Sequence, residues 1–212
     1  SGAIAAGILV QKGWRVTVVE RELFPRFSIG ESLLPQCMAF IEEAGMLDTL
    51  LSQADDLGFQ FKDGAAFYRD GEHSNFDFSQ KFSQGASTTF QVKRASFDKL
   101  LADKAQELGA DIRYQHEVTS VDFSKEGAFV SVKNANKNMV IEAKFVLDAS
   151  GYGRVLPKLL SLELPSTLSN KRAVFCHFED NIPKSSEAKN YDRNKILITV
   201  HPSKKDVWFW LI

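Results

Sequence analysis

The spacing of apolar residues predicts a helix followed by a buried strand at the start of the chain. Small and apolar residues recur at helical spacing over 2–12, and Gly13 follows them as a helix-ending glycine. Residues 15–20 are rich in valine, as in a strand that is buried on both faces. A helix that leads into such a strand is half of a βαβ unit. We therefore expect the first strand of that unit, which would precede Ser1, to be missing from this chain.

The rest of the chain alternates between helical and strand-like patterns. Residues 22–35 contain two prolines and a glycine without a clean period, which predicts a long loop. Helical spacing follows over 33–44 and ends at Gly45, and another helix is predicted from Ala95 to a cap at Gly109. Strands are predicted at 59–68, 74–78, 90–92, 111–114, 118–123, 128–133, 140–149, 171–178, 196–201 and 206–212.

These strands fall into two groups. Residues 140–149 are apolar enough to return to a central sheet, whereas 171–178, 196–201 and 206–212 read as a second, antiparallel sheet. The polar stretch 184–194 is expected to be a surface loop. The whole pattern predicts an α/β fold.

Composition and charge limit the kinds of partner. Apolar residues make up 44% of the chain, which suits a sizeable core, and the formal net charge is -1. Such a charge gives no global electrostatic reason to bind nucleic acid or an acidic membrane surface. The apolar stretch 3–10 is far shorter than the about 20 residues that cross a bilayer, so we expect no transmembrane segment. Small-molecule chemistry fits this composition better.

The cysteines and histidines indicate a reducing compartment and no metal site. Cys37 and Cys176 lie far apart in apolar neighbourhoods, which suits reduced, buried thiols in a cytosolic protein. The histidines have no paired spacing, with each other or with cysteine, that resembles a metal site. We therefore expect a cytoplasmic protein without a bound metal.

The first candidate for chemistry is the tail of a dinucleotide-binding fingerprint. Glycines in this motif let the backbone approach a pyrophosphate at a helix N-terminus, and an acidic residue further on accepts the ribose hydroxyls. Gly2 stands where the third glycine would, and Glu20 ends the following strand at a suitable distance. The alternative is an unrelated α/β unit in which Glu20 merely ends a strand.

Three longer segments carry a family resemblance. Residues 24–35 (FPRFSIGESLLP), 148–154 (DASGYGR) and 208–212 (WFWLI) follow one another in the order seen in one group of flavoproteins. The last segment matches a Trp-x-Trp-x-Ile-Pro signature, cut one residue before its proline. Together they resemble the flavin-dependent halogenases and their relatives in the tryptophan-halogenase-like superfamily, over residues 2–212.

The resemblance implies an FAD-binding domain of the glutathione-reductase type with an interleaved antiparallel-sheet substrate domain. The FAD-binding domain would comprise 1–58 and 91–165, and the substrate domain 59–90 and 166–212. In this family a flavin reductase supplies reduced FAD, which with oxygen and halide yields hypohalous acid for an electron-rich small-molecule or carrier-bound substrate. The isolated chain, lacking parts at both ends, is expected to be inactive.

The resemblance also implies which residues contact FAD. These are Gly2, Ala3, Glu20, Arg21, Ser32, Arg94, Val118, Asp148 and Gly151. The guanidinium fork of Arg94 would suit a phosphate or ring oxygen. Two alternatives remain open: Arg94 could pair with Asp98 at i+4, and Asp148 could cap the turn that follows it.

Lys62 is the candidate catalytic residue. Residues 61–67 (FKDGAAF) resemble the segment in which these enzymes carry a lysine that receives the oxidant. A buried ammonium can donate a hydrogen bond to hypohalous acid, and a lysine with a lowered pKa could form a haloamine. Strand alternation allows a plainer interpretation, in which Lys62 lies opposite Phe61 and points at water.

Trp208 and Trp210 share one face of their predicted strand. In the resembling family this pair sits near the flavin and is thought to discourage direct monooxygenation. Because Val207, Phe209 and Leu211 make the other face apolar as well, the alternative is a core strand with bulky side chains.

Two other functions compete with halogenation. One is a flavin monooxygenase or a reductase similar to geranylgeranyl reductases, which would share the fold and form no halide-dependent product. The other is an inactive binding module with a vestigial flavin fold, since the phosphate loop lacks its first strand and glycines.

Overall fold

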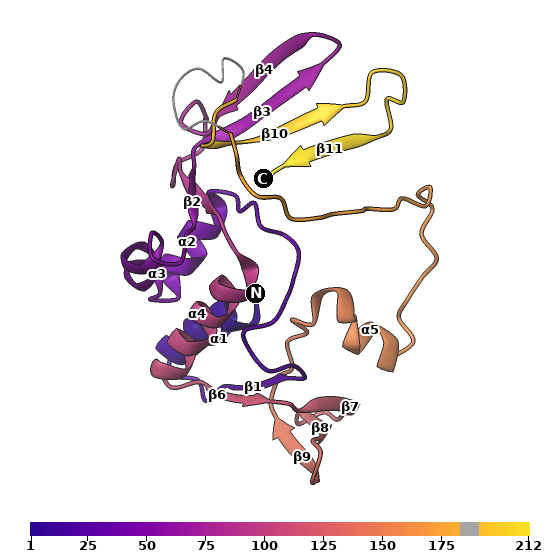
Figure 1. The fold of residues 1–212 in the computed structure, drawn as a ribbon. Helices are drawn as coiled ribbons and strands as arrows, with labels where there is room; N and C mark the ends of the chain where they lie inside the picture. Colours follow the sequence, from indigo (N-terminus) through magenta and orange to yellow (C-terminus); the bar gives the residue numbers. More distant parts are fainter. Residues whose placement is uncertain (183–190) are drawn as a thin grey trace.

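The computed structural model describes residues 1–182 and 191–212. Helices occupy the middle of the molecule, with a three-stranded sheet at one end and a four-stranded sheet at the other (Figure 1). A long extended segment runs along one side from α5 as far as residue 182 (Figure 1). The chain is therefore a mixed α/β structure, as the alternating pattern predicted.

The expected helix and strand at the start of the chain are confirmed. Helix α1 spans Gly2–Gln11, and Gly13 follows it with a φ of +82°, a conformation that glycine adopts without steric cost. Strand β1 (Thr17–Glu20) pairs in parallel with β6 (Asp111–Tyr114), with Glu20 opposite Tyr114. Helix α4 (Arg94–Glu107) packs against α1 beside this pair. The two strands and two helices form the frame on which the site is built.

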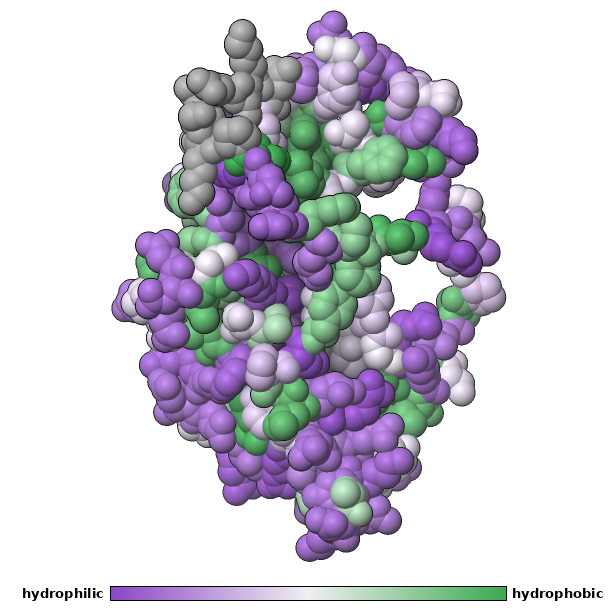
Figure 2. Space-filling model, viewed as in Figure 1, coloured by the Kyte–Doolittle hydropathy of each residue, from purple (hydrophilic) through white to green (hydrophobic). Residues whose placement is uncertain are grey.

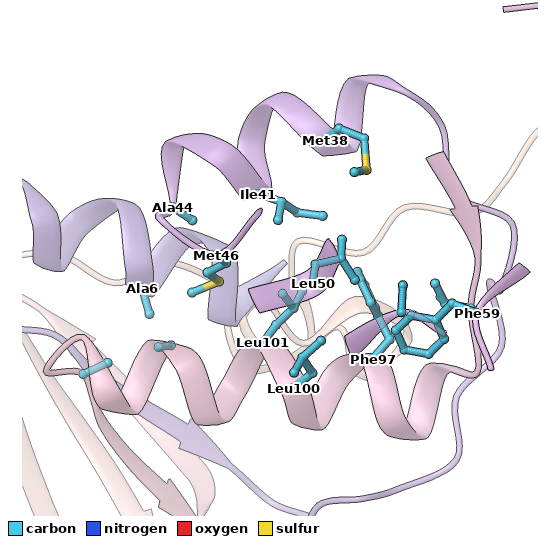
Figure 3. Close-up of a cluster of buried hydrophobic side chains, with 14 residues drawn as sticks. Ala6, Met38, Ile41, Ala44, Met46, Leu50, Phe59, Phe97, Leu100 and Leu101 are labelled. Carbon is cyan, nitrogen blue, oxygen red and sulfur yellow. The ribbon is translucent and has the colours of Figure 1, made fainter. Parts of the chain in front are cut away.

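Helix α2 (Gln36–Glu43) and helix α3 (Leu47–Gln53) cover α1 and α4. The hydrophobic pattern did not predict α3, because seven residues with three leucines are too few to show a helical period. Its Leu50 enters the main core, whose fully buried members also include Ile41, Ala44 and Met46 (Figure 3). This core joins all four helices.

Gly7 lets α1 approach the turn between α2 and α3. A Cβ atom at Gly7 would lie 2.5 Å from Met46 Cε and 2.9 Å from the carbonyl oxygen of Ala44. The methionine could move, but the backbone oxygen could not without shifting the turn. A glycine is therefore required for this close helix contact.

The predicted strand 59–68 is divided in two. Strand β2 (Gln60–Lys62) pairs with β5 (Thr89–Gln91), whereas β3 (Gly64–Arg69) belongs to the four-stranded sheet. Between them, the Asp63 amide donates to the Asn194 carbonyl, and the Asp63 carbonyl accepts from the Phe78 amide. These two bonds redirect the chain from one sheet into the other.

The four-stranded sheet has the order β11-β10-β3-β4, with β4 at Glu72–Asp77, β10 at Lys195–Val200 and β11 at Trp208–Leu211. The expectation of a purely antiparallel sheet is wrong, because β10 runs parallel to β3. A hairpin forces neighbouring strands to be antiparallel, but β3 and β10 are separated by more than a hundred residues, which permits a parallel crossover.

Strands β7 (Glu117–Phe123), β8 (Ala128–Lys133) and β9 (Asn138–Ala143) form an antiparallel meander with its own small core around Val121, Val130 and Val132. The prediction that 140–149 returns to the central sheet is wrong. Strand β9 ends at Ala143, and 144–150 has no regular structure, because no neighbouring strand pairs with it among the described residues.

A short 3-10 helix (Gly151–Gly153) and α5 (Val155–Leu159) follow. The predicted strand 171–178 is also wrong: these residues are exposed and have no regular structure, since no described sheet edge pairs with them. Cys176 is consequently exposed rather than buried, whereas Cys37 is half-buried. Residues 184–190 of the expected surface loop lie outside the described residues.

The described residues contain neither a helix that could cross a membrane nor a cluster of side chains that could bind a metal. Within this part of the chain, no helix is both long and apolar enough to span a bilayer. Nor does it bring three or more histidine, cysteine, aspartate or glutamate side chains together in a way that could hold a metal ion.

We predict that Leu50→Ala lowers the free energy of unfolding by ~2–5 kcal/mol, because it removes a fully buried side chain from the core that joins the helices. Leu51→Ala is the matched control: the neighbouring leucine is 52% exposed and should change stability by less than ~1 kcal/mol. Urea unfolding of both variants measures the difference. Equal losses would show that α3 does not pack as described.

Candidate functional site

The N-terminus of α1 is the point at which distant segments meet. A Cβ atom at Gly2 would lie 3.3 Å from the Ala149 Cβ, so the segment containing Asp148 and Gly151 runs directly beside the start of the helix. Asp98 and Arg94 lie within electrostatic reach of this start of the helix. The first amides of a helix carry a partial positive charge and attract anions. Gly2 and Ala3 therefore occupy a position suited to a phosphate.

Glu20 and Arg94 belong to one network of charged groups. Arg26 extends between Glu20 and Asp98, with its guanidinium 3.5 Å and 3.1 Å from their carboxylates. Arg94 donates to both oxygens of Asp98, at 2.9 and 3.1 Å, and to the Ile29 carbonyl at 2.8 Å. The expected i+4 alternative for Arg94 is thus present in the structure. Contact with a cofactor stays a prediction for this residue.

This network also accounts for Gly30. Its φ is +105°, and a Cβ atom there would lie 2.9 Å from Arg94 Nη1. A side chain at Gly30 would therefore strain the backbone and displace the arginine from the Ile29 carbonyl. The glycine lets the loop close over the guanidinium.

Both carboxylate oxygens of Asp148 accept hydrogen bonds from backbone amides further along the chain. Oδ1 accepts from the Ser150 amide at 2.8 Å, and Oδ2 accepts from the Leu156 amide at 2.9 Å. Burial disfavours the charged form, but the hydrogen bonds from Ser150 and Leu156 outweigh it and lower the pKa of Asp148. The turn-capping alternative is therefore what the structure shows, while a flavin contact stays a prediction.

Arg21 and the start of β7 lie together on the other side of Glu20. The His116 amide donates to the Glu20 carbonyl at 3.0 Å, which brings the chain just before Val118 beside the end of β1. Arg21, Gln115, Glu117, Lys133, Asn134 and Ala135 line an open depression of about 250 Å³. Val118 is half-buried against the small core of the meander. The geometry brings Arg21 near the start of the strand that contains Val118, and both were predicted to contact FAD.

The side chain of Lys62 is buried. The interpretation from strand alternation, in which it points at water, is therefore wrong. Lys62 as a whole is only 2% exposed. The ammonium donates to Ser32 Oγ and to the Leu33 carbonyl, both at 2.7 Å. It also lies 5.2 Å from the centre of the Phe78 ring, within range of a cation–π interaction.

Three paired segments hold Lys62 in this position. Lys62 is opposite Thr89 in the β2–β5 pair, and β5 also forms a bridge between Gln91 and Ser32. Lys62 therefore reaches past β5 to a segment that lies on the far side of that strand. Alternation along β2 alone could not reveal this, because the burying partner comes from a loop about thirty residues earlier.

The charge of Lys62 has no carboxylate partner within the described residues. Burial lowers the pKa of Lys62, and the nearby Cys37 thiol acts weakly in the opposite direction. The neutral amine is therefore more accessible than it is for a lysine in water. A lysine of this kind can serve as a nucleophile or a proton donor.

Several polar groups around these sites were not predicted. Thr89 Oγ1 and Gln91 Oε1 are buried beside Lys62 without a hydrogen bond among the described residues. Arg26 lies in the FPRFSIGESLLP segment (24–35), but the sequence predicted no role for it. Nothing in a short strand or a loop marks such residues, because their importance arises from tertiary pairing.

Trp208 and Trp210 lie on β11, opposite Val200 and Ile198, and are 59% and 55% exposed. They are thus not buried as core side chains among the described residues. No hydrogen bond or ring contact in this part of the chain links them to Glu20 or Lys62. Their place near a flavin stays a prediction.

Apolar residues gather along the middle of the face shown in Figure 2, beside hollows that the extended segment spans. Phe27 and Phe175 form an exposed stacked pair, with ring centres 5.4 Å apart. The loop before α2 and the extended segment therefore approach each other through aromatic side chains.

These features define a mixed α/β protein in which several distant segments meet at the N-terminus of α1. The family described as "FAD binding domain" matches residues 1–205. The chain belongs to this family, and FAD is the cofactor that the membership assigns to it.

The chain is also similar to flavin-dependent halogenases. A 1H-pyrrole-2-carbonyl-[peptidyl-carrier protein] chlorinase of Pseudomonas fluorescens is 27% identical, over 100% of this chain and 50% of the relative. A tryptophan 2-halogenase of Chondromyces crocatus is 33% identical, over 71% of this chain and 28% of the relative. The chain thus spans about half, or less, of the curated relatives it matches.

Two solved structures resemble the whole chain. A flavoprotein/dehydrogenase from Cytophaga hutchinsonii has a TM-score of 0.82 and 39% identity, over 100% of this chain and 50% of that one. The flavin-dependent halogenase CmlS has a TM-score of 0.75 and 26% identity, over 100% of this chain and 37% of that one. Both are flavoproteins, in agreement with the family.

We predict that the free energy of unfolding of the unmodified protein, measured relative to that of a Lys62→Met variant, increases as the pH rises. Between the lowered pKa of Lys62 and the ordinary value of 10.5, the unfolded chain binds more protons than the folded one. Stability is therefore gained as pH rises through this window and lost below it. Urea unfolding from neutral pH upward measures the difference between the two proteins.

Lys137→Met serves as the control, since Lys137 is an exposed residue in the turn between β8 and β9. The difference in the free energy of unfolding between Lys137→Met and the unmodified protein should not vary with pH. A pH-independent difference for Lys62→Met would contradict the burial of its charge.

Proposed function

We propose that this protein is an FAD-dependent, halogenase-like enzyme. It would use reduced FAD, oxygen and halide on an electron-rich organic substrate, either free or attached to a carrier protein. The observation that carries the proposal is the buried, uncompensated Lys62 in the FKDGAAF segment. A flavin reductase as the source of reduced FAD and a cytoplasmic location belong to the same proposal.

The residues around α1 fit an FAD molecule. The Gly2 and Ala3 amides would hold its pyrophosphate, and Glu20 its ribose hydroxyls. Arg21 and Val118 would lie beside the adenine. The support is their clustering, since the Gly2 contact with Ala149 and the His116 bond to Glu20 draw four segments together.

The remaining FAD contacts would come from Ser32, Arg94, Asp148 and Gly151. Their hydrogen-bonding capacity is partly used within the chain, so a contact with FAD would add to these bonds or replace them. When bound, FAD supplies the redox chemistry of the reaction. The protein supplies the position of the groups around it.

The domain division follows the same logic. Residues 1–58 and 91–165 would form an FAD-binding domain of the glutathione-reductase type, and 59–90 and 166–212 a substrate domain. The change of sheet at Asp63 and the pairing of β3 with β10 support this interleaving. Trp208 and Trp210, on the edge strand of the four-stranded sheet, would face the flavin in the assembled enzyme.

Lys62 would act on hypohalous acid. As an ammonium it would donate a hydrogen bond to the oxidant and orient its halogen. As a neutral amine it would form an N–halogen bond in place of an N–H bond, with release of water. Burial favours the second path, because it lowers the pKa of Lys62 and excludes competing solvent.

A reductase or dehydrogenase is the second candidate function. The observation that favours it is the similarity to the Cytophaga hutchinsonii flavoprotein/dehydrogenase, at 39% identity over the whole chain. Such an enzyme would bind FAD at the same residues but form no halide-dependent product. Halide dependence therefore separates the two candidates.

We predict that Glu20→Ala weakens FAD binding roughly 10- to 100-fold, because it removes a charged acceptor for the ribose hydroxyls. The measurement is titration of the apoprotein with FAD, followed by flavin fluorescence. Glu42→Ala is the control, since Glu42 is exposed on α2 and should leave the affinity unchanged. Equal affinities in all three proteins would place the ribose elsewhere.

We predict that the flavin-loaded protein, as its gene encodes it, brominates an electron-rich aromatic probe when given a flavin reductase, oxygen and bromide. Lys62→Met should abolish brominated product while FAD remains bound, because the variant cannot receive the oxidant. Lys137→Met should keep full activity. Product formed equally by Lys62→Met would refute the role of the lysine, and FAD binding without any halide-dependent product would favour the reductase.

A further inference from the structure

We propose that Ser32 is a positioning residue for Lys62, and that its hydroxyl and the Leu33 carbonyl together set the direction of the lysine side chain. The two acceptors lie 2.7 Å from the ammonium and come from adjacent residues of one segment. The kinetic consequence of this inference rests on the proposed function, whereas the contact itself does not.

Ser32 is held by backbone pairing rather than by its side chain. The Leu33 amide donates to the Phe90 carbonyl at 3.1 Å, and the Val92 amide donates to the Glu31 carbonyl at 2.8 Å. Ser32 itself forms the bridge with Gln91. The hydroxyl is consequently fixed relative to β5, and through β5 relative to β2, which carries Lys62.

The surroundings of Lys62 offer few other partners. The Phe78 ring covers one side of the ammonium, and Cys37 on α2 is the titratable group whose charge acts on it. A buried ammonium with neutral partners depends strongly on each acceptor, because no counter-charge compensates for lost hydration. Removing the Ser32 hydroxyl would leave the Leu33 carbonyl as the remaining acceptor among the described residues.

A hydroxyl can support both protonation states of the lysine. It accepts a hydrogen bond from the ammonium and can donate one to the neutral amine, whereas the Leu33 carbonyl only accepts. The bond to the ammonium is charge-assisted and stronger. Ser32 therefore holds Lys62 in one place through a change of protonation, and favours the ammonium within it.

Thr89 provides a matched control inside the same cluster. Thr89 is only 1% exposed and lies directly opposite Lys62 in the strand register, yet its hydroxyl makes no hydrogen bond among the described residues. Thr89→Val removes this hydroxyl and keeps the shape of the side chain. A general effect of burying fewer polar atoms would appear in both variants, but a positioning effect only in Ser32→Ala.

The experiment compares Ser32→Ala, Ser32→Thr and Thr89→Val in the flavin-loaded protein. The pKa of Lys62 is followed by NMR of lysine labelled with carbon-13 at Cε, with the signal assigned by its loss in Lys62→Met. We expect Ser32→Ala to shift the protonation equilibrium roughly tenfold toward the neutral amine, as the loss of one charge-assisted hydrogen bond implies. Ser32→Thr should restore the original pKa, and Thr89→Val should not change it.

The kinetic readout is the pH profile of kcat/KM for halogenation. One limb of this pH profile reports the titration of Lys62. In Ser32→Ala this limb should shift along the pH axis by as much as the pKa measured by NMR. If Ser32→Ala does not fold, Ser32→Cys replaces it, since a thiol fills the space but accepts hydrogen bonds weakly.

An unchanged pKa in Ser32→Ala or Ser32→Cys overturns the inference, whether or not the protein halogenates. An equal shift in Thr89→Val also overturns it. A shifted pKa in a protein that forms no halogenated product supports the positioning of Lys62 and refutes the proposed function instead.

Discussion

The burial of one ammonium group, for which the described part of the chain provides no counter-charge, is the constraint on which the candidate site depends. Water no longer solvates Lys62, so the hydrogen bonds to Ser32 and Leu33 must replace that solvation. Those acceptors remain in place only while their segment is paired with β5 and β5 is paired with β2. The state of the lysine is therefore coupled to the integrity of a small three-segment sheet.

The loop that supplies these acceptors also reaches the network of charged groups formed by Glu20, Arg26, Arg94 and Asp98. Its Ile29 carbonyl accepts from Arg94, and its Arg26 contacts Asp98 and Glu20. Arg94 begins the helix that packs on α1, so the loop is attached at one end to the charged network beside α1 and at the other to Lys62. The charged network and Lys62 are thus joined by one continuous segment of the chain.

Sequence reasoning succeeded where a local pattern determines the structure. The helix 2–11 and the strand ending at Glu20 follow from spacing and from Gly13, and the helix from Arg94 follows from its apolar face. It failed where the structure depends on which distant segments pair with each other. Residues 171–178 have strand-like composition but no partner edge, and β10 runs parallel to β3 because of a crossover that no short window shows. The burial of Lys62 likewise depends on a loop distant in sequence.

The charged groups of the two sites differ in a way that bears on function. Glu20, Arg26, Arg94 and Asp98 neutralise one another, and such a paired network is suited to holding a ligand with little change in protonation. Lys62 is the opposite case, since its partners are neutral and its pKa is lowered by burial. A group that only bound a cofactor would gain nothing from this arrangement, whereas one that must change between ammonium and amine would. The contrast supports the proposal that Lys62 takes part in the chemistry and that the charged network lies beside the cofactor.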